Sequence, residues 1–158
     1  MAVTQAKLRR ALRRLPLRRR WTCGGTPFDW DFSAKSRALR PLDSRVYQVP
    51  LKPAWRTLLI FGEYDYAEGG GTNPFIGARS TDGMIWGLDP ERDRKPMFLL
   101  NSTLDAFVDT FQALDAYLGA KQPLPADIDR TLRAIDKSAF GRSDWKPFVA
   151  FVRAEQEG

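Results

Sequence analysis

The sequence predicts a single α+β domain, in which a mostly antiparallel or mixed β-sheet of about five strands packs with an N-terminal helix and C-terminal helices. Its 158 residues suit one domain with a sizeable core. Short apolar runs bounded by glycine and proline fill the middle of the chain, as is typical of strands. The last third changes to helical spacing, and strands followed by helices favour α+β over a doubly wound sheet.

A basic arm, residues 1–20, opens the chain and is expected to be helical. Thr4 is suited to cap the helix, and Pro16 disfavours its continuation. Its apolar side chains recur at helical spacing, at Leu8, Ala11, Leu12 and Leu15. The arm holds eight Lys and Arg and no acid, which leaves 17 basic against 19 acidic side chains in the rest of the chain. The high isoelectric point therefore reflects the arm and not a broad phosphate-binding face.

The sheet is expected over residues 46–100. Residues 21–45 are interrupted by glycine, proline and polar residues, so we expect irregular structure there. Extended runs predict strands at residues 45–49, 55–64, 74–80, 84–89 and 96–100. Asp82-Gly83 separates the third and fourth of these runs, and Asp-Gly between extended runs predicts a hairpin.

Helices are expected over residues 102–156. Ser102 and Asp105 are spaced as a capping box for the first helix, which Gly119 is placed to end. A second helix is expected at residues 127–137. A third is expected to start near Ser143, with Pro147 tolerated in its first turn.

The residue types that are missing exclude several kinds of site. The chain has no histidine and one cysteine, so Ser-His-Asp and Cys-His catalysis and zinc sites are not expected. We therefore predict a protein that is not an enzyme and needs no cofactor or metal, although a site built on carboxylates, Lys or Tyr stays open. The acid pairs Asp29/Asp31 and Asp127/Asp129 are spaced for Mg²⁺, but structural roles are favoured. No apolar run is long enough to span a membrane, and no secretory signal is recognised, so a cytoplasmic location is expected.

Two groups of residues are candidates for contact with a partner. Acidic and aromatic residues are expected at strand ends and turns, where they would suit a basic protein surface or form only a solvated rim: Glu63, Tyr64, Asp65, Tyr66, Asp82, Trp86 and Asp89. Four arginines of the basic arm could meet phosphates, anionic lipid or an acidic protein: Arg9, Arg10, Arg13 and Arg14. The favoured interpretation is that they stay solvated while the leucines of the arm cover an edge of the domain.

Three runs between residue 57 and residue 111 form a recognisable pattern, TLLIFGEYD, PFIGARSTDGMIWGLD and PMFLLNSTLDAFVDTF, and the chain closes with SDWKPFVAFVRAE. In these runs the chain resembles the SUKH superfamily of SMI1/KNR4-like proteins, and within it the SUKH-4-like immunity proteins. Within these runs, Asn101-Ser102-Thr103-Leu104 with Phe107 is the closest match. The Arg-rich start and the glycines at 69–71 depart from the pattern. The resemblance implies a SUKH-like domain over residues 1–158 with no catalytic residues to carry over.

The resemblance implies the function of a bacterial immunity protein in interbacterial competition. Such an antitoxin binds and neutralises a cognate polymorphic toxin, often one that acts on nucleic acid. Two alternatives stay open. One is a regulatory scaffold of the SMI1/KNR4 kind, and the other is a nucleic-acid-associated protein that uses residues 1–20.

Overall fold

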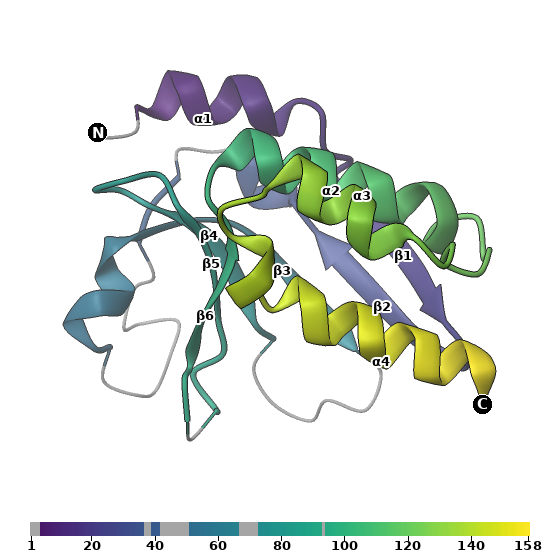
Figure 1. Ribbon diagram of the computed structural model, residues 1–158. Coiled ribbons are helices and arrows are strands. Elements are labelled where there is room, and N and C mark those ends of the chain that lie inside the picture. Colours follow the sequence, from purple (N-terminus) through teal and green to yellow (C-terminus); the bar gives the residue numbers. More distant parts are fainter. Residues whose placement is uncertain (1–3, 37–38, 42–50, 67–72, 93) are drawn as a thin grey trace.

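The computed structural model describes residues 4–36, 39–41, 51–66, 73–92 and 94–158. Its centre is one antiparallel sheet of six strands, whose spatial order β1-β2-β3-β4-β5-β6 follows the order of the sequence. Four α-helices accompany the sheet, and Figure 1 shows α2, α3 and α4 on one side of it. The α+β class and the single domain are confirmed, with one strand more than the expected five.

The N-terminal hairpin corrects the sequence analysis. Strands β1 (Arg18–Cys23) and β2 (Thr26–Asp31) occupy the end of the supposed helical arm and the start of the stretch expected to be irregular. Trp21, Cys23, Phe28 and Trp30 are buried and alternate with polar residues, which is the period of a half-buried strand. Glycine and proline suggested a loop, but the glycines form the tight turn between two strands.

The remaining strands follow the expected order. A 3₁₀ turn, η2 (Pro53–Thr57), leads into β3 (Leu58–Tyr66), which therefore begins later than expected. Strands β4 (Phe75–Arg79) and β5 (Ile85–Leu88) form the predicted hairpin, and β6 (Met97–Asn101) ends the sheet. The strand expected at residues 45–49 and the glycines at 69–71 lie outside the described residues.

The helices confirm most of the predicted boundaries. Helix α1 spans Gln5–Leu12 and is capped by Thr4, whose side chain accepts from the Lys7 amide. Helix α3 (Ile128–Ile135) lies within the expected range, and α4 (Trp145–Glu157) starts near Ser143 as expected and ends one residue beyond the expected limit. Helix α2 (Leu104–Leu118) ends at Gly119 as predicted, but its cap is Thr103 and not Ser102. Ser102 is bound instead to Asp136, as described below.

The sheet buries apolar side chains on both faces. The larger core lies under the helices and includes Trp21, Phe61 and Phe107. A smaller cluster lies against β3, β4 and β5, where Trp55 of η2 and Leu51 pack on Leu58. Neighbouring residues of β4 belong to different clusters, so the clusters occupy opposite faces. In Figure 1 the blue turn η2 lies on the other side of β4–β6 from the helices.

Candidate functional site

A charged hollow of about 420 Å³ lies where β1, β2 and β3 run side by side. It is lined by Arg18, Arg19, Arg20, Asp29, Trp30, Asp31, Glu63, Asp65 and Asn73. Strand register arranges six of these charges in two rows across the sheet, because Arg18 pairs with Asp31 and Asp31 with Glu63, while Arg20 pairs with Asp29 and Asp29 with Asp65. Each row therefore contains one arginine and two carboxylates.

The charges of the hollow are unevenly compensated. Arg20 donates two hydrogen bonds to Asp29, from Nε at 2.7 Å and Nη2 at 2.9 Å, and this contact lowers the pKa of the Asp29 carboxyl. Arg18 Nε lies 3.9 Å from Asp31 Oδ2. On β3, in contrast, neither Glu63 nor Asp65 has an ion pair among the described residues. Burial, with repulsion from Asp31 and Asp65, raises the pKa of Glu63.

The structure divides the four predicted residues of β3 between the two faces of the sheet. Glu63 and Asp65 share the charged hollow, whereas Tyr64 points to the opposite face and packs against the larger core. Tyr66 ends β3, and its side chain lies outside the described residues. All four belong to a strand and not to a loop, so they are held in fixed register with β2.

The other three predicted residues lie away from the hollow. Asp82 sits in the β4–β5 turn, at the Leu58 end of β3, and accepts from Arg79 Nε at 3.0 Å. The Arg79 guanidinium also lies over the Trp86 ring, 5.0 Å from its centroid, and Trp86 packs on the smaller apolar cluster. Asp89 follows β5 and accepts from the Glu91 amide. These contacts hold Asp82, Trp86 and Asp89 within the domain, although the buried Trp86 Nε1 has no hydrogen-bond partner in the described residues.

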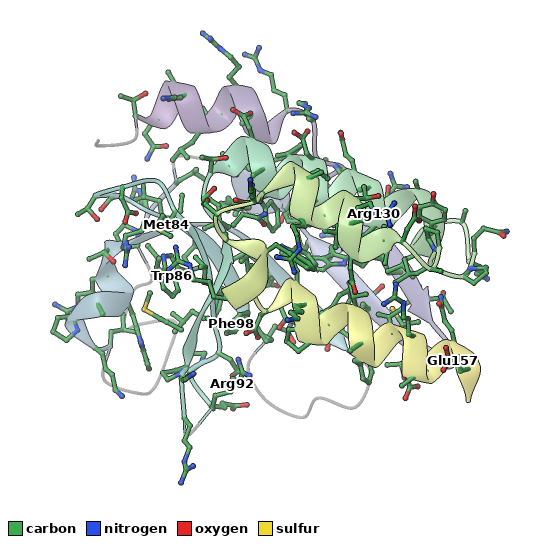
Figure 2. The ribbon with its side chains drawn as sticks, viewed as in Figure 1. Met84, Trp86, Arg92, Phe98, Arg130 and Glu157 are labelled. Atoms are coloured by element: carbon green, nitrogen blue, oxygen red, sulfur yellow. The ribbon has the colours of Figure 1, made fainter. Side chains whose placement is uncertain are left out.

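An aromatic groove of about 340 Å³ lies on the helix face, between α4 and the sheet. Its walls include Phe28, Trp30, Tyr64, Phe98, Trp145, Phe148 and Phe151. An ion pair of Arg92 Nη1 with Asp144 Oδ2, 3.6 Å long, stands at its rim, and Figure 2 shows Arg92 beside Phe98. Phe151 is 41% exposed. This groove could not be predicted from the sequence, because its walls come from segments more than 100 residues apart. The only local signal is the spacing of Phe148 and Phe151, which places them on one helix face.

The basic arm is largely explained by contacts within the domain. Arg14 bonds Asp109 and Gln112 of α2, and Arg18, Arg19 and Arg20 face Asp31, Asp115 and Asp29. Leu8, Leu12 and Leu15 are buried, which agrees with the interpretation that the leucines of the arm cover an edge of the domain. Arg9, Arg10 and Arg13 are exposed and have no ion pair among the described residues.

The motif that matches the resemblance most closely has a structural role. Asp136, 5% exposed, accepts from the Ser102 amide at 2.7 Å, from Ser102 Oγ at 2.7 Å and from Asn101 Nδ2 at 3.1 Å. The Asn101 side chain also accepts from Trp145 Nε1 at 2.8 Å. Burial opposes ionisation of Asp136, but its hydrogen bonds outweigh burial and lower its pKa. This polar network ties β6 to the end of α3 and the start of α4.

Other kinds of site are poorly represented in the described ranges. Within them no group of three or more His, Cys, Asp or Glu side chains is arranged to hold a metal ion. Cys23 is buried, and burial with repulsion from Glu155 raises the pKa of its thiol to about 11, so the reactive thiolate is suppressed. None of the described helices is long and apolar enough to cross a membrane.

Comparison with known proteins adds no relative. A scan against protein-family models, a search of curated proteins and a search of solved structures each found no match. The resemblance to the SUKH superfamily therefore stays a prediction.

Proposed function

We propose that this protein is a stoichiometric inhibitor of the immunity type, which binds and neutralises a toxin that acts on nucleic acid. The observation that carries the proposal is the charged hollow, where Glu63 and Asp65 have no cation of their own in the described part of the chain. Burial, together with repulsion from Asp31 and Asp65, raises the pKa of Glu63, so its ionised carboxylate is unfavourable in the free protein. A Lys or Arg side chain from a partner would stabilise that carboxylate.

The class of partner follows from this charge. Enzymes that act on nucleic acid present cations to the phosphate backbone. An acidic hollow that accepts those cations would cover the substrate-binding surface, and complementary charge would speed the encounter and exclude wrong partners. The proposed inhibitor thus competes with substrate and needs no chemistry of its own.

The rigid setting of the carboxylates supports the same function. Asp29, Asp31, Glu63 and Asp65 project from two paired strands, and bidentate contact with Arg20 fixes Asp29. Side chains that are already ordered lose little conformational entropy when a partner binds. The hollow can therefore give a tight complex from a few contacts.

Genetic context supplies the partner for the test. A toxin gene with a delivery module is expected directly upstream, and the two purified proteins are expected to form a complex that blocks the toxin. The variant E63Q/D65N should weaken the complex by at least about tenfold, measured by calorimetry and by toxin inhibition. A matched control, D127N/E157Q, removes the same charge from exposed positions, one of which is the end of α4 in Figure 2.

Two outcomes would contradict this proposal. One is a toxin complex that forms with the same affinity in E63Q/D65N as in the control. The other is a solitary locus, no protection against any neighbouring toxin and capture of a resident cellular protein, which would favour a regulatory scaffold of the SMI1/KNR4 kind.

A further inference from the structure

Helix α1 carries a cationic outer face that the inhibitor function leaves unused. Its leucines are buried in the core. Leu8 and Leu12 are each 1% exposed, and Leu15, just beyond the helix, is 2% exposed. At about 100° per residue, the cations lie on an arc of about 160° centred opposite these leucines. They are Lys7, Arg9, Arg10 and Arg13, and all four are exposed. Figure 2 shows long nitrogen-tipped side chains that project from α1 away from the sheet.

The charge of this outer face is not neutralised within the described part of the chain. The neighbouring arginines are engaged, because Arg14 pairs with Asp109 and the arginines of β1 pair with Asp31, Asp115 and Asp29. None of the four outer cations has an ion pair or a side-chain hydrogen bond in the described residues. The face therefore presents four free positive charges on about two turns of helix.

The rest of the surface narrows the class of ligand. An amphipathic helix that inserts into a membrane needs a free apolar side, and that of α1 is buried. A protein interface is centred on aromatic or apolar anchors, yet the large apolar side chains exposed in the described chain are Leu17 and Phe151, and neither belongs to α1. Stacking on single-stranded bases needs exposed aromatic rings, which α1 lacks. Binding to the phosphate backbone, in contrast, needs only cationic side chains.

We propose that the outer face of α1 binds the phosphate backbone of double-stranded nucleic acid without reading its sequence. Neutralising up to four phosphates releases counterions, so the logarithm of the binding constant should fall with the logarithm of salt concentration at a slope of about −3.6. That slope corresponds to about 150-fold weaker binding between about 50 and 200 mM salt. Such weak, salt-sensitive contact would hold the protein near the substrate of a toxin that acts on nucleic acid.

The test is fluorescence anisotropy of a labelled DNA duplex of about 20 base pairs, titrated with the full chain at several salt concentrations. The variant K7Q/R9Q/R10Q/R13Q should lose at least about 100-fold in affinity at low salt and most of the slope. The control R130Q/K137Q/R142Q/K146Q removes four exposed charges from α3, the chain after it and α4, and should keep the slope. Arg130 marks this control surface on α3 in Figure 2.

Three results would overturn the proposal. The first is no binding to duplex at about 50 mM salt, and the second is equal loss in the two fourfold variants, which would indicate net charge and not this face. The third is tighter binding to polyglutamate than to the duplex, which would indicate an acidic protein partner. E63Q/D65N should leave duplex binding unweakened, so failure here is distinguishable from failure of the proposed inhibitor function.

Discussion

Glu63 shows, at the scale of one residue, how a binding site can cost stability. Its carboxylate lies directly across from Asp31 in the β2–β3 register, and Asp65 also repels it. Like charges directly opposite each other on a sheet destabilise it by about 0.2–1 kcal/mol. A raised pKa in the folded state means that this cost is absent below the ordinary pKa of Glu and is fully present above the raised value.

We therefore expect E63Q to stabilise the free protein by about 0.2–1 kcal/mol at pH 7 while it weakens the complex. The measurement is urea unfolding of wild type and variant between pH 3.5 and 7, and the stability difference should grow as pH rises through the folded pKa of Glu63. A variant less stable than wild type at pH 7 would show that Glu63 makes a favourable contact in the free protein.

Ionisation of Asp136 stabilises the folded protein, which is opposite to the effect of ionising Glu63. Its pKa is lowered by hydrogen bonds, so its contribution to stability is present above the ordinary pKa of Asp and is lost as pH falls through the lowered value. D136N places an amide opposite donors from Ser102 and should cost about 2–3 kcal/mol at pH 7, seen in urea unfolding. It should also remove part of the acid sensitivity of wild type. The exposed D127N is the control, and equal stability of the two variants would contradict the role given to this network.

At the scale of elements, the β1–β2 hairpin depends on one of its two turn glycines. Gly24 has φ of +62°, and a Cβ added there would lie 2.4 Å from the Glu155 carbonyl oxygen of α4. Gly25 has open space around the corresponding position. The two neighbours therefore form a natural pair for comparison.

G24A should destabilise the protein by about 2 kcal/mol or more, because alanine disfavours positive φ and its methyl group meets backbone. G25A should be neutral or slightly stabilising, since alanine lowers the entropy of the unfolded chain. Midpoints of urea unfolding measure both changes. If G24A and G25A lost equal stability, the cause would be the backbone of the turn and not its packing on α4.

The same hairpin shows what the sequence could and could not reveal. The helices and the β4–β5 hairpin were predictable because each has a local signal, such as the Asp82-Gly83 turn or the apolar stripe of α2. Strand β2 has no such signal, because Pro27 and the nearby glycines are typical of a loop and the alternation of Phe28 and Trp30 is too short to outweigh them. The charged hollow was therefore not predictable either, because the pairing of β2 with β3 is what brings Asp29 and Asp31 opposite Asp65 and Glu63.

At the scale of the whole molecule, the two apolar clusters lie on opposite faces of one sheet. Strand β3 supplies Phe61 to the larger core and Leu58 to the smaller cluster. Trp21, Trp30 and Trp145 report on the first, and Trp55 and Trp86 report on the second. The clusters share strands, so neither is expected to unfold alone.

We expect the W55F/W86F variant, which reports the larger core, and the W21F/W30F/W145F variant, which reports the smaller cluster, each to show one fluorescence transition. Within each variant this transition should coincide with loss of far-UV circular dichroism. The comparison is made within a variant because the substitutions change overall stability. Separate fluorescence and dichroism midpoints in either variant would mean that the sheet melts in parts.

The position of β1 at the border of the sheet has a consequence for solubility. Among the strands that the structure describes, none pairs with the outer edge of β1, and such a border invites a second chain to extend the sheet. Three consecutive arginines, Arg18 to Arg20, occupy this border. Another copy that approached edge to edge would bring its own arginines against them. The residues that hold the acids of the hollow in place thus also oppose polymerisation of the protein through its open edge.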